Sequence, residues 1–195
     1  MSVGAWAEEI ARHEINGRAI IIDSDGTWKY AEAVAAPTGE CADGNIITSK
    51  KINLSMCIDS AWRIDNKTSG NFEFQFYNAS SEIYGALVAE RTGVPTEALE
   101  YAILFHAANA MGLRNEDVPV LKKSKVTLNG VEWNYIEYDI KLNGANFRFG
   151  NYYISLGETG VAQIPFWCGR AYFEKNRKQI EEMASTIEVS SKPLE

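Results

Sequence analysis

Two Asn-Gly dipeptides, Asn129-Gly130 and Asn143-Gly144, separate long runs of alternating apolar and polar residues in the second half of the chain. Asn-Gly between alternating runs is the strongest short-range signal for a β-hairpin, because both residues tolerate the positive φ angles of the tight turn. Together with a third break at Gly157–Gly160, these turns predict an antiparallel meander over residues 118–168. Long adjacent strands of this kind form one contiguous sheet with a covered face.

Other periods in the sequence predict the elements around this meander. Residues 96–111 have apolar side chains at helical spacing, with Thr96 as the expected N-cap and Gly112 as the end. Helical period returns over 170–185, and a short strand follows at its end. Alternation predicts further strands at 52–58, 72–77 and 83–90.

A separate β-hairpin is predicted near the start of the chain. Arg18–Asp23 is a β-branched run, Ser24-Asp25-Gly26 supplies a turn, and Thr27–Tyr30 forms the return strand. Just upstream, Ala5-Trp6-Ala7 fits the A-x-A pattern after which signal peptidase cuts. We therefore expect an exported bacterial protein, periplasmic or secreted, whose sequence here begins within the end of a signal peptide.

The fold class that these elements predict is α+β: an antiparallel sheet covered by two helices and preceded by a β-hairpin. We expect residues 8–33 to form the hairpin element. Residues 34–49 are rich in glycine and small residues, which is typical of a linker. Residues 50–189 form the main domain.

Charge and hydropathy exclude several classes of partner. The 195-residue chain carries a net charge of −7, which disfavours nucleic acid and an anionic membrane surface as main partners. No stretch reaches the apolar length that spans a bilayer, so an integral membrane protein is not expected.

The cysteine count is odd, so one thiol is left over if an internal bridge forms. In an exported protein Cys41 and Cys57 are the preferred pair, closing a short loop. The alternative is three reduced thiols, with Cys57 and Cys168 buried as small hydrophobes.

Catalytic and metal-binding signals are weak. His13 and His106 are the two histidines, and neither lies in the context of a nucleophile. Glu137 and Asp139 are two residues apart on one predicted strand and share a face, where paired carboxylates could serve acid–base chemistry or hold Ca²⁺. Solvated strand charges explain them more simply, so we expect no enzyme, no metal and no cofactor.

Aromatic residues are the remaining functional signal, since they crowd the hairpin and the meander. Most are expected in the core, and the rest could form a docking surface or line a concave face. Tyr152 and Tyr153 are adjacent and face opposite sides of a strand, so one should lie away from the face that the helices cover. The candidate binding residues are Trp28, Tyr30, Tyr152, Tyr153 and Trp167.

The order of elements over residues 50–189 resembles the PsbP/Mog-type α/β/α sandwich. Cys57-Ile-Asp-Ser-Ala-Trp62 is similar to the family's first strand and its P-x-x-W turn, with Ser60 where a proline is common. The segment from Phe173 to Val189 is similar to the closing helix and terminal strand. Separately, Gly17-Arg18 and Asp25–Tyr30 resemble a DGTWxY element near the start of many exported bacterial proteins.

The resemblance implies a binding or accessory role without turnover. The leading hypothesis is a non-catalytic exported module that binds a protein partner or an envelope component. The alternative is a small-ligand carrier with an aromatic pocket between sheet and helices. An enzyme using Glu137, Asp139 and His106 is the third possibility. A flat exposed aromatic patch would favour the first, and a deep pocket with convergent polar groups the other two.

Overall fold

The computed structural model describes residues 9–15, 18–23, 28–30, 41, 43–65 and 71–190, the first three ranges as backbone only. The chain divides into two units, Met1–Thr38 and Gly39–Glu195. In the first unit, β1 (Glu9–Ile15), β2 (Arg18–Asp23) and β3 (Trp28–Tyr30) form an antiparallel sheet with β2 in the centre. The predicted strands pair as β2 and β3, and β1 adds a strand that the sequence analysis did not include.

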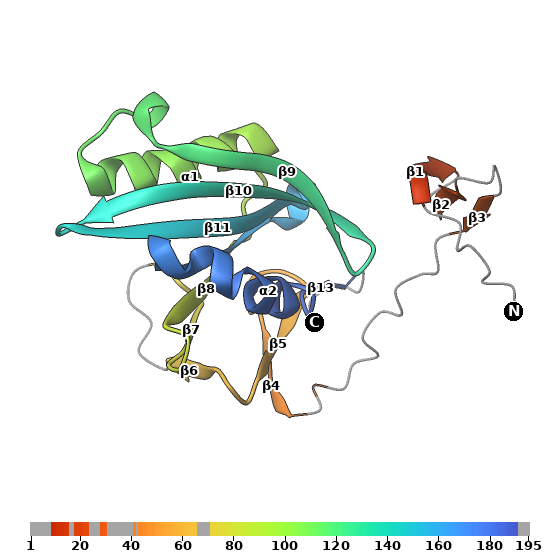
Figure 1. Cartoon of the computed structure of the whole chain (residues 1–195), viewed down its shortest axis with the longest axis horizontal. Helices are drawn as coiled ribbons and strands as arrows, with labels where there is room; N and C mark the ends of the chain where they lie inside the picture. The colour runs from red at the N-terminus through yellow and green to blue at the C-terminus, as the bar shows by residue number, and fades with distance from the viewer. Residues whose placement is uncertain are drawn as a thin grey trace, which may run out of the picture. The chain divides into compact units, whose positions relative to one another are not determined.

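The second unit is built on a seven-stranded sheet in which every neighbouring pair is antiparallel (Figure 1). The α+β class is therefore confirmed. In spatial order the strands are β6 (Arg63–Asp65), β7 (Phe74–Asn78), β8 (Ile83–Glu90), β12 (Val161–Gly169), β11 (Ala145–Ser155), β10 (Val131–Leu142) and β9 (Val120–Leu128).

Both Asn-Gly turns take the conformation that their sequence predicts. Asn129 and Gly130 have φ angles of 46° and 80°, and Asn143 and Gly144 have 50° and 84°. Positive φ at both central residues is the signature of the type I′ turn, whose twist matches that of the flanking strands. The meander of β9, β10, β11 and β12 is thereby set by local sequence.

A small second sheet contains β4 (Gly44–Thr48), β5 (Leu54–Asp59) and β13 (Glu188–Val189), with β5 in the centre. The assignment of residues 34–49 as a linker is wrong for β4, which pairs with β5 from Gly44 to Thr48. The glycines and small residues of this segment led to the linker prediction, because most side chains of β4 stay accessible to solvent and give no strand pattern. Within β4 only Ile47 is buried, so β4 is held mainly by its pairing with β5.

Two helices cover opposite faces of the large sheet. α1 (Thr96–Met111) packs on β10 and β11, and α2 (Phe173–Ala184) lies on the other side with the small sheet (Figure 1). The helix at 96–111 has the predicted bounds, and Gly112 ends it with φ of 68°. Pro95, not Thr96, is its N-cap, and no side chain caps it. Three 3₁₀ turns lie at Asn115–Asp117, Gly157–Thr159 and Arg170–Tyr172.

The sheet separates two apolar clusters. The larger fills the space between the large sheet, the small sheet and α2, where Trp133, Phe166 and Phe173 are fully buried. The smaller lies beneath α1, where Leu99 and Ile103 meet residues of β10 and β11. This arrangement gives an α/β/α sandwich in which both sheet faces are partly covered.

Cys41 and Cys57 are bonded, with Cα atoms 5.5 Å apart, and Cys168 is a free buried cysteine. Cys57 is also held through its backbone, because the Thr186 hydroxyl accepts from its N–H and donates to its carbonyl. Neither helix of the described residues is long and apolar enough to cross a bilayer.

Candidate functional site

A row of five aromatic residues crosses the sheet on the α1 side. Tyr77, Tyr84, Trp167, Phe149 and Tyr138 come from β7, β8, β12, β11 and β10, and each is directly opposite the next in the strand register. Directly opposed residues share a face of the sheet. We call these five residues the aromatic ladder.

The rings of the aromatic ladder stack on one another. Ring centroids are 6.3 Å apart for Tyr77 and Tyr84, 5.8 Å for Tyr84 and Trp167, and 5.4 Å for Trp167 and Phe149. Phe149 and Tyr138 are separated by 5.5 Å, and neighbouring ring planes differ by 9° to 27°. Tyr84, Trp167 and Phe149 each have a stacked neighbour on both ring faces, so these three rings turn their edges outward.

Exposure increases along the ladder from Tyr138 beneath α1 to Tyr84, and Tyr77 beyond it is again half-buried. Tyr138 is buried beneath the helix, where loss of hydration raises the pKa of its hydroxyl. Phe149, Trp167 and Tyr77 are half-buried, whereas Tyr84 is 43% exposed. The end of the ladder away from α1 therefore presents tyrosine and tryptophan to solvent, and these residue types are enriched at binding hot spots.

α1 adds further exposed aromatic surface. Tyr101 is 60% exposed and Phe105 is 44% exposed, and their rings stack 6.2 Å apart. Between Glu100 and Arg114 the chain has no Asp, Glu, Lys or Arg. The exposed surface of this part of α1 thus combines two aromatic rings with the polar side chains of His106 and Asn109, and exposed aromatic rings are typical of contact surfaces.

The three predicted binding residues of the second unit, Tyr152, Tyr153 and Trp167, do not form one surface. Trp167 lies in the ladder, whereas Tyr152 and Tyr153 are both buried in the two clusters on opposite sides of the sheet. The expectation that one of these two tyrosines lies away from the helices was wrong, because each face has a helix of its own. Trp28 and Tyr30 are on β3, described as backbone only.

Tyr153 has a structural role beneath α1. Its hydroxyl donates to the Glu100 carboxylate at 2.5 Å, and Lys123 Nζ donates to the other oxygen of that carboxylate at 2.6 Å. Burial and the bond to Glu100 raise the pKa of Tyr153, so the hydroxyl stays protonated and donates. These bonds fasten α1 to β11 and β9.

The carboxylates of Glu137 and Asp139 lie on the α2 side of the sheet and are bound by arginines. The buried Glu137 accepts from Arg177 Nη2 at 2.9 Å and from the Tyr135 hydroxyl at 3.0 Å. Arg148 Nε donates to Asp139 at 2.8 Å. Burial and the Glu137 charge raise the pKa of Tyr135.

Buried carboxylates with guanidinium partners serve to hold elements together, since removing either partner would leave an uncompensated charge. Here the ion pairs join α2 to β10 and β11. His106 is exposed on α1, on the opposite side of the sheet from Glu137 and Asp139. The three residues of the enzyme hypothesis are therefore not assembled into one site. His13 is on β1, described as backbone only.

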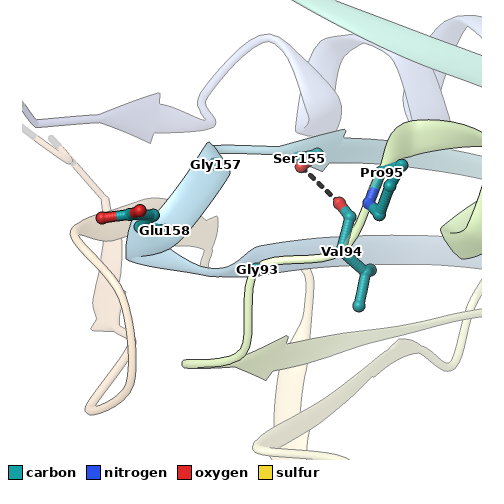
Figure 2. Close-up of a pocket in the computed structure, with 6 residues that line it drawn as sticks. All are labelled: Gly93, Val94, Pro95, Ser155, Gly157 and Glu158. Atoms are coloured by element: carbon teal, nitrogen blue, oxygen red, sulfur yellow. Dashed lines mark hydrogen bonds between the residues drawn. The ribbon is translucent and has the colours of Figure 1, made fainter.

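A hollow of about 470 Å³ lies between the loops that follow β8 and β11. Its lining is Gly93, Val94, Pro95, Ser155, Gly157 and Glu158 (Figure 2). Ser155 Oγ donates to the Val94 carbonyl at 2.6 Å, and Glu158 points away from that bond. The hollow has no aromatic lining and no convergent polar groups. Among the described side chains, no group of three or more His, Cys, Asp or Glu is placed to hold a metal ion.

Two ladder members, Tyr77 and Tyr84, were missed by sequence reasoning. Successive side chains of a strand point to opposite faces, so the sequence of β7 could have placed Tyr77 on the face opposite the core residue Phe76. No local signal places Tyr84 beside Trp167, because β8 and β12 are distant in sequence.

No protein-family model and no curated protein matches the sequence. Among solved structures, a protein from Bacteroides thetaiotaomicron VPI-5482 aligns with a TM-score of 0.53 at 15% identity, covering 77% of this chain and 50% of that one. The chain thus spans half the length of the Bacteroides protein. Cyanobacterial PsbP (CyanoP) from Synechocystis sp. PCC 6803 aligns with a TM-score of 0.52 at 10% identity, covering 79% of this chain and 99% of that one.

LpqN, involved in cell envelope biogenesis of Mycobacterium tuberculosis, has a TM-score of 0.49 at 13% identity, covering 76% and 91% of the two chains. At the identities of the first two structures, the similarity shows the fold alone. The PsbP-like fold predicted from the element order is confirmed in this sense. The relation of the first hairpin to a DGTWxY element stays a prediction.

Proposed function

We propose that this chain is a non-catalytic, exported protein-binding or accessory module whose contact surface is the α1 side of the large sheet. Its partner is a protein or an envelope component. The observation that carries the proposal is the solvent-exposed end of the aromatic ladder, where Tyr84 is 43% exposed beside Trp167 and Tyr77.

The composition of this surface supports protein recognition. Tyrosine and tryptophan bury large area with little loss of side-chain freedom and dominate binding energy at many interfaces. Tyr101 and Phe105 extend the exposed aromatic surface on α1. Trp28 and Tyr30, two residues apart on one short strand, are proposed as a second contact point.

Export is part of the proposal, and the disulfide supports it because a reducing cytosol disfavours disulfide bonds. The disulfide between Cys41 and Cys57 persists in oxidising compartments such as the periplasm. The A-x-A pattern at Ala5-Trp6-Ala7 adds to this argument.

The carrier hypothesis has less support. Tyr135 and Tyr152, which lie between the sheet and α2, pack against each other with centroids 4.9 Å apart and belong to the core. The 470 Å³ hollow lies elsewhere and is lined by loop residues. A ligand pocket needs apolar walls with a few placed polar groups, which this hollow does not supply.

A capture experiment with matched variants tests the proposal. The full chain, Tyr84→Ser and Tyr172→Ser are each immobilised and exposed to an envelope extract of the native host, and bound proteins are quantified by mass spectrometry. Tyr172 is the control, because it is a tyrosine of similar exposure, at 56%, outside the ladder. We expect Tyr84→Ser alone to lower capture of a specific protein by about fivefold to thirtyfold, as a hot-spot loss of one to two kcal/mol implies. Equal capture by all three would contradict the proposed surface.

A further inference from the structure

We infer that the uncovered part of the α1 side takes an amphipathic helix of the partner, packed alongside α1. The inference rests on the proposed function and specifies the chemistry of that partner. The docking strip is defined by residues of β7, β8 and β12 that share the face of the aromatic ladder. They are the residues of this face, short of Glu90 at the end of β8, whose side chains are not buried, namely Gln75, Tyr77, Tyr84, Val88, Gln163 and Trp167, whereas Ala86 and Pro165 between them are buried.

The strip is the part of this face that α1 leaves open. α1 packs on β10 and β11, and Tyr138 at that end of the ladder is buried beneath it. On β12 and β8 the ladder continues through the half-buried Trp167 to the exposed Tyr84. Within the described residues of the second unit, the chain thus covers one half of this face with a helix, and no other element packs on the adjoining half.

The dimensions of the strip fit one helix. Neighbouring strands are about 4.8 Å apart, so β7 and β12 are separated by about 10 Å, the diameter of a helix with its side chains. β8 has 8 residues and is about 26 Å long at 3.3 Å per residue. α1 has 16 residues and is about 24 Å long. A partner helix of similar length would cover the strip from end to end.

The distribution of charge fits an amphipathic occupant. None of the six strip residues is charged. Charged side chains stand at its margins, with Arg63 and Asp65 exposed on β6 and Glu90 exposed at the end of β8. A helix with an apolar stripe against the rings and both signs of charge along its flanks would match this pattern.

The ring geometry favours protein side chains over sugars. A sugar packs on the open face of an aromatic ring, and here the faces of Tyr84 and Trp167 are used in the stack. Ring edges instead make edge-to-face contacts with partner aromatics and van der Waals contacts with aliphatic side chains. The Tyr84 hydroxyl and the Trp167 indole N–H can also donate hydrogen bonds to uncharged polar side chains that flank the apolar stripe of the partner helix.

Two synthetic peptides test the inference on the isotope-labelled full chain. Both have 18 residues, the same composition of Leu, Gln, Lys and Glu, and no net charge. One has leucines at i, i+3, i+4 and i+7, and the other alternates leucine with polar residues. We expect the helical-period peptide alone to shift the amide resonances of β7, β8 and β12. We also expect Tyr84→Ser to weaken its binding at least tenfold, with Tyr172→Ser unchanged.

Each other result overturns the helix inference. Equal binding of both peptides, shifts outside the strip, or no binding at millimolar peptide would show that the strip does not select a helix. A dimer in analytical ultracentrifugation that Tyr84→Ser dissociates would assign the strip to a second copy. A glycan that shifts the same amides would assign it to a sugar. If envelope capture depends on Tyr84 while neither peptide binds, the helix inference fails and the proposed function stands.

Discussion

Asn129 and Asn143 take the same backbone conformation in turns of the same type, yet their side chains differ in what they contact. The Asn129 amide donates to the Ser185 carbonyl at 2.9 Å and to the Ile187 carbonyl at 2.8 Å. These acceptors lie between α2 and β13, at a point where helix carbonyls have no helical partner. Asn129 therefore joins the β9–β10 turn to the end of the chain, in addition to forming that turn.

Replacing each asparagine with glycine separates these two roles, because glycine also accepts positive φ. Asn129→Gly should lower the free energy of unfolding by about 1–2 kcal/mol through the loss of two net hydrogen bonds. Asn143→Gly should change it by less than about 0.5 kcal/mol. Chemical denaturation of the two variants beside the native chain measures the difference. Equal losses would mean that the Asn129 amide contributes nothing beyond the turn.

At the scale of elements, Glu100 determines how α1 sits on the sheet. Burial opposes its ionisation, but the hydrogen bonds from Lys123 and Tyr153 outweigh that effect and lower the pKa of the Glu100 carboxyl. Since the folded pKa is depressed, the charged carboxylate adds stability above the unfolded value of about 4.3. That stability is lost as the pH falls through the lower folded value.

Glu100→Gln should therefore be less stable than the native chain at pH 7, and this gap should shrink as the pH falls below about 4.3. Thermal unfolding between pH 3 and pH 7 measures the gap. Glu181→Gln, at an exposed position on α2, serves as the control and should show a smaller gap at pH 7. A gap for Glu100→Gln that stays constant over this range would exclude a contribution from the carboxylate charge.

At the scale of the whole molecule, the disulfide acts where the chain enters its second unit. Cys41 follows the unit boundary by a few residues, and its bond to Cys57 fastens the chain before β4, an edge strand in which only Ile47 is buried. The bond closes a loop of 16 residues. Crosslinks of this length stabilise by about 3 kcal/mol, chiefly by restricting the unfolded chain.

Reduction with a dithiol should lower the free energy of unfolding by about 2–4 kcal/mol. Hydrogen exchange in β4 should accelerate while β10 keeps its protection, because β10 lies within the large sheet. The double variant Cys41→Ser, Cys57→Ser should show no response to the reductant. Native protein that is equally stable with and without reductant would contradict a stabilising role for the bond.

Local chemistry was enough to predict the meander and the first helix. The Asn-Gly turns specify positive φ within two residues, and Gly112 ends α1 at the predicted position for the same conformational reason. Sequence reasoning failed at β4, where five residues with little burial of their own depend on a partner strand and a crosslink. A strand of that kind has no strong pattern to recognise.

The candidate surface depended on pairings that are distant in sequence. Trp167 could be named from the sequence, but Tyr84 joins it only because β12 inserts between β8 and β11. Likewise, Tyr152 and Tyr153 are both buried because the two helices cover opposite faces. Turns, strand periods and helix ends are short-range and can be predicted from neighbouring residues. Strand order and the placement of helices are set by the burial of the whole core, and tertiary structure alone decided them.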